Sequence, residues 1–230
     1  MGGWYIITKT IKGRPYLYRQ RTWRDGAHVR TESHYLGPAD GGVRALKPAD
    51  AVRLWNTDEL VGLRASDLPE REREAVRFYT DTSYEEINQI LRGDRPMTDA
   101  EAERSAALLS ALMRPEARLL HDLTLYRRAL VREGTKVGDV FSDIGFLSCT
   151  VDFRHAIHHP YKNCEDYKSV ILSINSKCGG RGYLSPNGLT LYNNEKEIIR
   201  YGGWFVVTDV VDINGETVYN IIDETEYDIR

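Results

Sequence analysis

The sequence predicts an α+β fold, in which a small β meander and a helical lobe precede a mostly antiparallel β core. Three observations lead to this prediction: short β-rich runs fill residues 3–37, helical periodicity dominates residues 47–121, and strand-like runs return from residue 123 to the end. Because helices and strands are segregated along the chain, we do not expect a wound parallel sheet.

The N-terminal segment is predicted to form a small antiparallel meander. Its runs WYIIT, PYLYRQRTW and HVRTESHYL are separated by Lys12-Gly13 and Asp25-Gly26, which are typical turn pairs. Lys and Arg far outnumber carboxylates here. A Gly- and Pro-rich stretch at 37–42 marks a linker. We therefore expect residues 1–42 to form a basic β-rich accessory module, followed by a main domain over residues 43–230.

The next segment, residues 47–121, is predicted to be the helical lobe. Ser83 and Thr98 are each followed by a Glu three residues later, which is the capping-box signature of a helix start. Gly93 and Pro115 supply stops.

The remaining residues, 123–230, are predicted to form the β core. Six strand-like runs occur in it: LTLYRRALV, GFLSCTV, SVILSIN, EKEIIRY, GWFVVTDVVD and ETVYNIID. The last two flank Asn214-Gly215, and an Asn-Gly pair is the strongest short hairpin signal.

The composition and the cysteine pattern indicate the class of protein and its cellular compartment. The apolar share of 41% and the charged share of 28% are typical of a globular protein. Cys149, Cys164 and Cys178 form no CxxC pair and cannot all pair within one chain, which favours a reducing compartment. The N-terminus lacks a signal-peptide pattern and no apolar stretch reaches the roughly 18 residues of a membrane span. We therefore expect a cytoplasmic protein with no membrane partner.

Three groups of polar residues stand in the apolar strands of the β core: Arg127 with Arg128, Ser148, and Glu195 with Glu197. Strands bury such groups only with partners. Arg suits bidentate binding of phosphate, and carboxylates two residues apart point to the same face of a strand. Each group alone is more often part of a solvated strand face than of a site.

The order of these groups resembles the Arg-Ser-Glu clade of mono-ADP-ribosyltransferase toxins, which includes the clostridial binary actin toxins and insecticidal relatives. YTDTSYEEINQILRG at 79–93 is similar to the family's helical run. GTKVGDVFSDIGFLSCT at 134–150 is similar to its Ser-Thr-Ser segment, and GYLSPNGLTLYNNEKEII at 182–199 to the segment that ends in its Glu-x-Glu pair. The resemblance implies an ADP-ribosyltransferase-like fold with a two-sheet β core, and an NAD cleft.

The resemblance implies roles for five site residues. Arg127 follows an aromatic residue, as in the family, and is expected to bind the NAD pyrophosphate together with Arg128. Ser148 is expected to orient the catalytic Glu, with Thr150 beside NAD. The chain departs from the family here, because Ser-Cys-Thr replaces Ser-Thr-Ser. Glu197 is expected to contact the nicotinamide ribose and to stabilise an oxocarbenium-like transition state.

The acceptor side of the site is implied in the same way. Glu195 is expected to accept a proton from the acceptor, and in the family a Glu at this position accompanies arginine as acceptor. Tyr192 corresponds to an aromatic residue that contacts the target protein. Residues 151–168 correspond to a loop beside the phosphate and the nicotinamide, with Tyr161 and Lys162 as candidate NAD contacts.

Two other forms of chemistry are not expected. The histidines and the cysteine of 151–168 do not match the spacing of a zinc site, so we expect no metal. Gly179-Gly180-Arg181-Gly182 lacks the Rossmann spacing, so NAD is expected as a substrate and not as a hydride carrier.

Several alternatives stay open at this point. The acceptor is a protein arginine in the leading interpretation, and RNA or DNA recruited by the basic N-terminal module in the second. The same module could instead pair with the acidic C-terminus or with a partner protein. A third interpretation is a binding module that has lost its chemistry. A toxin of this kind would be delivered by another component, or would act inside a cell and be held in check by a cognate inhibitor or antitoxin.

Overall fold

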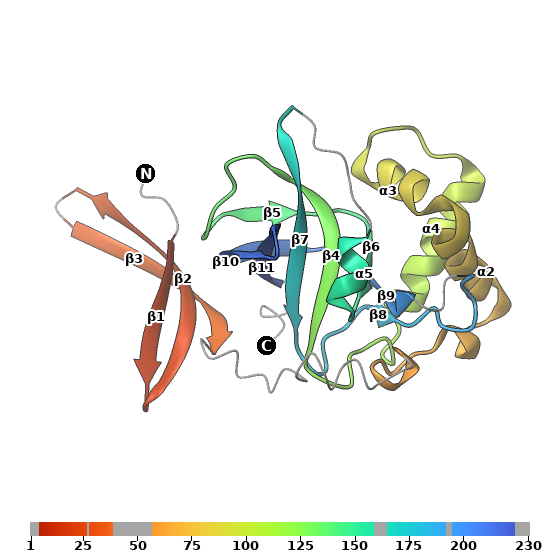
Figure 1. Cartoon of the computed structure of the whole chain (residues 1–230), viewed down its shortest axis with the longest axis horizontal. Helices are drawn as coiled ribbons and strands as arrows, with labels where there is room; N and C mark the ends of the chain where they lie inside the picture. Colours follow the sequence, from red (N-terminus) through yellow and green to blue (C-terminus); the bar gives the residue numbers. More distant parts are fainter. Residues whose placement is uncertain (1–4, 27, 39–56, 159–164, 192–194, 224–230) are drawn as a thin grey trace.

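The computed structural model describes residues 5–26, 28–38, 57–158, 165–191 and 195–223. Three parts follow one another along the chain: a small N-terminal sheet, a helical lobe and a large sheet. In Figure 1 the N-terminal sheet and the helical lobe lie on opposite sides of the large sheet. The predicted α+β class is confirmed.

The N-terminal sheet is the predicted antiparallel meander. Its order is β1-β2-β3, with β1 at Tyr5–Ile11, β2 at Arg14–Asp25 and β3 at His28–Pro38. Lys12 and Gly13 have φ angles of 51° and 79°, which the tight primed turn of a hairpin requires.

The N-terminal sheet also contacts the large sheet. Ile6 and Leu17 pack against the buried side chains of Val206 and Ile222. Apolar packing of this kind joins an accessory sheet to its neighbour through the hydrophobic effect. The division of the chain at residue 42 stays a prediction.

The helical lobe differs from the prediction in one respect. Thr98 caps its helix as expected, because its Oγ1 accepts a hydrogen bond from the Glu101 N–H at 3.3 Å. The predicted helix start at Ser83 is wrong, since a π-helical turn carries one helix into the next without a break. The elements are η1 (Thr57–Glu59), η2 (Ala65–Asp67), α2 (Glu70–Phe78), the π-turn η3 (Tyr79–Ser83), α3 (Tyr84–Arg92) and α4 (Asp99–Leu112).

The large sheet has the strand order β5-β10-β11-β7-β4-β6-β9-β8. Neighbouring strands are antiparallel except for β11 and β7. Asn214 and Gly215 both have positive φ and form the predicted hairpin turn. The strands are β4 (Leu123–Arg132), β5 (Val140–Ser142), β6 (Phe146–Thr150), β7 (Tyr167–Ser176), β8 (Tyr183–Leu184), β9 (Glu197–Tyr201), β10 (Trp204–Ile213) and β11 (Glu216–Asp223).

Two halves of this sheet enclose a shared core, as the two-sheet prediction requires. Strands β4 and β6 are joined by a single residue pair, Tyr126 with Thr150. Buried side chains from both sides of this junction belong to one cluster, among them Leu172 of β7 and Cys149 of β6. The sheet therefore folds over between β4 and β6, which leaves space for a cleft at the junction.

The helical lobe packs on β6, β9 and β8, and a buried amide fixes its position. Phe146 and Ile199 share a core cluster with the helices. Asn88 of α3 accepts a hydrogen bond from the Phe146 N–H at 2.8 Å and donates one to the Phe146 carbonyl at 2.9 Å. Gly145 allows this approach, because a Cβ there would lie 2.6 Å from Asn88 Oδ1. The amide thereby holds β6 two residues before Ser148.

Candidate active site

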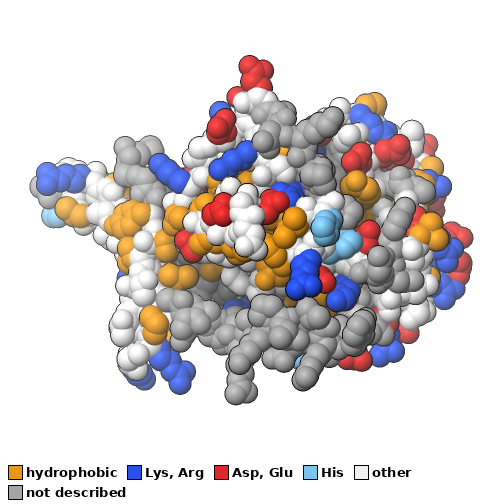
Figure 2. All heavy atoms as spheres, viewed as in Figure 1, with side chains coloured by type: hydrophobic (Ala, Val, Ile, Leu, Met, Phe, Trp, Pro, Cys, Tyr) orange, Lys and Arg blue, Asp and Glu red, His pale blue; other side chains and the backbone are white. Residues whose placement is uncertain are grey.

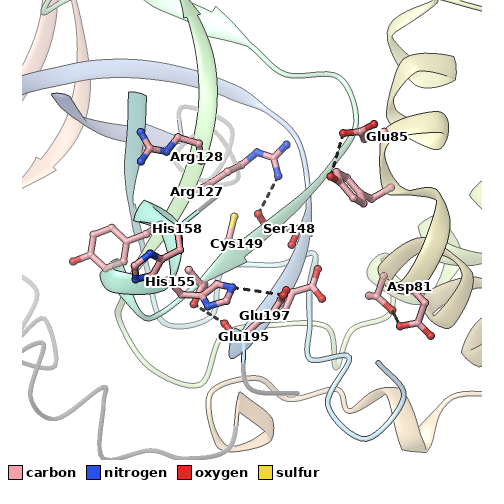
Figure 3. Close-up of a pocket in the computed structure, with 15 residues that line it drawn as sticks. Asp81, Glu85, Arg127, Arg128, Ser148, Cys149, His155, His158, Glu195 and Glu197 are labelled. Carbon is pink, nitrogen blue, oxygen red and sulfur yellow. Dashed lines mark hydrogen bonds and ion pairs between the residues drawn. The ribbon is translucent and has the colours of Figure 1, made fainter. Parts of the chain in front are cut away.

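A cleft of about 550 Å³ lies between the helical lobe and the large sheet (Figure 3). Its walls come from η3 and the start of α3, from β4 and β6, from the short helix α5 (Phe153–Ile157), and from the segment that enters β9. Six of the residues predicted from the sequence line it: Arg127, Arg128, Ser148, Thr150, Glu195 and Glu197.

Strand register explains why these distant residues meet. Thr150 of β6 is paired with Tyr126 of β4 on one side and with Glu197 of β9 on the other. Ser148 lies two residues before Thr150, so both side chains leave β6 on the same face. The predicted Ser and Glu therefore belong to adjacent strands at the point where the sheet bends.

The two neighbouring arginines have different positions. Their side chains leave β4 on opposite sides (Figure 3). Arg127 turns toward β6, and its Nη1 donates a hydrogen bond to the Ser148 carbonyl at 3.0 Å. Arg128 is buried, with Nη1 on Glu216 Oε2 at 2.7 Å and Nη2 on the Ile157 carbonyl at 3.0 Å. Arg128 thus joins β4, β11 and α5, and a role in binding NAD would have to compete with these contacts.

Glu197 is a buried carboxyl group of the cleft, and its pKa is raised. Only 9% of the residue is exposed. Burial, together with the negative charge of Glu195, raises its pKa to about 7, although a hydrogen bond with Ser148 and the charge of Arg127 oppose the shift. A carboxyl group in this state changes protonation near neutral pH. Ser148 contacts Glu197, as the resemblance implies, although its catalytic role stays a prediction.

Glu195 lies beside Glu197 and is positioned through its backbone. The Thr150 hydroxyl donates a hydrogen bond to the Glu195 carbonyl at 2.8 Å. Lys196 has a φ of 50° and turns the chain between the two glutamates. The Glu195 carboxylate lies 3.7 Å from His155 Nε2, and about a quarter of each side chain is exposed. Glu195 is thus more accessible than Glu197, as a group that meets an incoming acceptor should be.

Cys149, which replaces the middle Thr of the Ser-Thr-Ser pattern, has a small effect on the site. Cys149 is 2% exposed and its side chain belongs to the sheet core. Burial raises the pKa of this thiol to about 11, so it stays protonated and acts as a small apolar side chain. Thr150 retains the hydroxyl at the third position and uses it on Glu195.

The residues on the opposite wall of the cleft are not among those predicted from the sequence. Asp81 and Glu85 line it from the helical lobe and face the strand residues (Figure 3). Asp81 Oδ1 accepts a hydrogen bond from the Leu191 N–H at 3.0 Å, which joins η3 to the segment before β9. The motif at 79–93 contains both residues, but helical periodicity places them only on a polar face. His155 also lines the cleft, and the sequence marks it only as one of the histidines of residues 151–168.

Three predicted residues, Tyr161, Lys162 and Tyr192, lie outside the described residues, as does Cys164. Within the ranges that the structure describes, no group of three or more His, Cys, Asp or Glu side chains could hold a metal ion. In the same ranges no helix is long and apolar enough to cross a membrane.

The sequence of the chain matches the model of a known protein family. The family model for ADP-ribosyltransferase exoenzymes matches residues 53–226. The chain belongs to this family of toxins. This ADP-ribosyltransferase uses NAD as a substrate and is a mono-ADP-ribosyltransferase, so the interpretation as an inert binding module is set aside. No curated protein matches the chain in a sequence search.

Solved structures show the same fold at low identity. The Vis toxin, an ADP-ribosyltransferase from Vibrio splendidus, is 19% identical with a TM-score of 0.58, over 79% of this chain and 88% of that one. Plx2a, an ADP-ribosyltransferase toxin from Paenibacillus larvae, is 14% identical with a TM-score of 0.59, over 78% and 97%. The C3 exoenzyme of Clostridium limosum is 13% identical with a TM-score of 0.59, over 77% and 95%.

Proposed function

We propose that this ADP-ribosyltransferase modifies arginine side chains of a protein, with Arg127, Ser148, Glu195 and Glu197 as its catalytic residues. The observation that carries the proposal is the distribution of charge in the cleft. Arg127 lines the same cleft as the carboxylates of Asp81, Glu85, Glu195 and Glu197, and the other guanidinium there, that of Arg128, is paired with Glu216. The guanidinium of Arg127 suits an anionic pyrophosphate, and the four carboxylates suit a cationic acceptor.

The cleavage step requires a negative charge next to the ribose. When the bond between nicotinamide and ribose breaks, its electrons leave with nicotinamide and the ribose becomes oxocarbenium-like. Ionised Glu197 opposes this positive charge and accepts a hydrogen bond from a ribose hydroxyl. Its hydrogen bond with Ser148 fixes the carboxylate before the substrate arrives. Arg127 holds the pyrophosphate, so that the ribose is presented to Glu197.

The transfer step requires a base, because a guanidinium has a pKa above about 12 and attacks poorly until it loses a proton. Two observations support Glu195 as this base: it lies beside Glu197, and its side chain is partly exposed. The proton passes from the acceptor nitrogen to Glu195 as that nitrogen bonds to the ribose carbon. Among the structural neighbours, Vis has been solved in complex with agmatine, a small guanidinium compound.

We also propose how the chain is divided and in which compartment it acts. Residues 43–230 form the catalytic domain and residues 1–42 an accessory module. The free thiols of Cys149 and Cys178 are compatible with a reducing compartment. In that setting the enzyme acts inside a cell, and a cognate inhibitor protects the cell that makes it.

The acceptor is tested with the purified chain and labelled NAD. Incubation with agmatine, with an arginine-rich protein and with single-stranded RNA is followed by separate protease and nuclease treatment of the products. We expect label on agmatine and on the protease-sensitive fraction, and none with the Glu197→Gln variant. Label in the nuclease-sensitive fraction alone would show that the acceptor is nucleic acid.

A further inference from the structure

The strand register divides the side chains of the N-terminal sheet between two faces. Successive residues of a strand point to opposite sides, and paired residues share a side. Ile6 and Leu17, which pack against the large sheet, lie on what we call the docked face. Tyr5 pairs with Gln20 and Lys9 with Tyr16, so these four residues lie on the opposite side, called the open face.

Charge is distributed unequally between these faces. The three strands contain two carboxylates, Asp25 and Glu32. Both lie on the docked face, where Asp25 pairs with Arg30 at 2.7 Å and Glu32 with Arg21 at 2.5 Å. The open face carries Lys9, Arg14 and Arg24, and within strands β1, β2 and β3 it has no carboxylate.

The open face also presents aromatic and apolar side chains. Tyr5 is 41% exposed, Ile11 45% and Val29 63%. Tyr18 lies under Lys9, whose Nζ is 4.4 Å from the centre of the ring. A cationic, aromatic strip therefore runs along the sheet, and Figure 2 shows Lys and Arg side chains gathered at its lower end, where β1 turns into β2.

Hydrogen bonds order this face in advance of any ligand. Lys9 Nζ donates to Ser33 Oγ at 3.2 Å, and Gln20 Nε2 donates to the Tyr5 hydroxyl at 2.9 Å. Thr22 and Thr31 continue the row across β2 and β3. Side chains held in this way lose little further conformational entropy when a ligand binds.

We propose that the open face of the N-terminal sheet is a docking surface for single-stranded nucleic acid. Phosphates would lie against the side chains of Lys9, Arg14 and Arg24, and an unpaired base would stack on the exposed ring of Tyr5. Charge complementarity favours this occupant, because the net charge of the whole chain is −3 and the basic strip is therefore a local feature. An acidic peptide would use the cations but would leave the rings without a partner.

This docking surface does not depend on the identity of the acceptor. The surface lies on the N-terminal sheet, and none of its residues lines the cleft. Its function is to place the enzyme on nucleic acid, whichever molecule receives ADP-ribose. Its loss should therefore leave the hydrolysis of NAD unchanged.

The test measures fluorescence anisotropy of a labelled single-stranded RNA of mixed sequence with the full chain. Lys9→Gln/Arg14→Gln/Arg24→Gln removes the open-face cations, and Arg71→Gln/Arg77→Gln/Lys136→Gln makes the same charge change elsewhere. We expect the first variant to bind on the order of tenfold more weakly, and the slope of log K against log salt to fall by about 2. The matched control should bind like the wild type.

A second variant tests the stacking. Tyr5→Leu keeps an apolar side chain but removes the ring, and we expect affinity to fall by about fivefold or more at high salt, where stacking dominates. Circular dichroism checks that each variant is folded; if the triple variant is not, Arg14→Gln and Arg24→Gln, both at exposed positions, replace it. Equal losses in the two triple variants, equally tight binding of polyglutamate, or no binding by the wild type would overturn the proposal.

Discussion

In the large sheet, Arg127 and Glu197 lie in a cleft where burial raises the pKa of Glu197 to about 7, whereas Lys9, Arg14 and Arg24 line an open face of the N-terminal sheet. A charge in a cleft is poorly screened by solvent, so the loss of one such charge has a large effect on the chemistry there. Charges on an open face are screened by water and salt, so they act together and each contributes little. The two sheets should therefore respond differently to the loss of single charges.

The largest effect is expected at Glu197. Glu197→Gln keeps the size of the side chain but removes its negative charge, and we expect NAD hydrolysis to fall by about 100-fold or more. Labelled nicotinamide release measures this rate. Glu133→Gln, a change at an exposed position, is the matched control and should hydrolyse NAD like the wild type. Near wild-type hydrolysis by Glu197→Gln would rule out the assignment.

The same buried carboxyl group should make stability depend on pH. Its pKa is raised from 4.5 to about 7, so between these values the folded protein binds more protons than the unfolded chain. Stability from this group is complete below pH 4.5 and is lost as the pH rises to 7, by about 3 kcal/mol in total.

The free energy of unfolding of Glu197→Gln, measured by urea titration, should therefore match the wild type near pH 4. It should exceed the wild type by up to about 3 kcal/mol at pH 8. A constant difference between the two proteins at both pH values would show that Glu197 does not titrate in this range.

A more selective effect is expected at Glu195. Glu195→Gln removes the base for the acceptor, so transfer to agmatine should fall by about 100-fold. Hydrolysis by water should fall much less, because water attacks an oxocarbenium ion with little help from a base. The ratio of the two rates in one reaction mixture is the measurement. A parallel loss of both activities would mean that Glu195 shares the role of Glu197.

The smallest effect on catalysis is expected from the N-terminal sheet. Deleting residues 1–42 removes Ile6 and Leu17 from Val206 and Ile222, which should lower the free energy of unfolding by about 1–2 kcal/mol. NAD hydrolysis should stay within about twofold of the wild type, since an accessory module has its own contacts and site. If the truncated chain loses hydrolysis or does not fold, the boundary at residue 42 is wrong and the meander belongs to the catalytic body.

The candidate site could be predicted in part, because its motifs are local in sequence. The strand around Arg127, the segment around Ser148 and the Glu-x-Glu pair each follow from a short run of residues. Asp81 could not be found in this way, because its contact with the Leu191 N–H joins segments that are distant in sequence. The predicted helix start at Ser83 is wrong for a related reason: a π-turn is not visible in a pattern of apolar residues.

By itself, the sequence determined the order of meander, helical lobe and β core, and the turns at Lys12-Gly13 and Asn214-Gly215, since periodicity and turn chemistry act over a few residues. Only the tertiary structure decided that Arg127 faces β6 while Arg128 pairs with Glu216. It also decided which face of the N-terminal sheet keeps its cations without a carboxylate. These properties depend on strand register and on burial, and both arise when distant segments pack together.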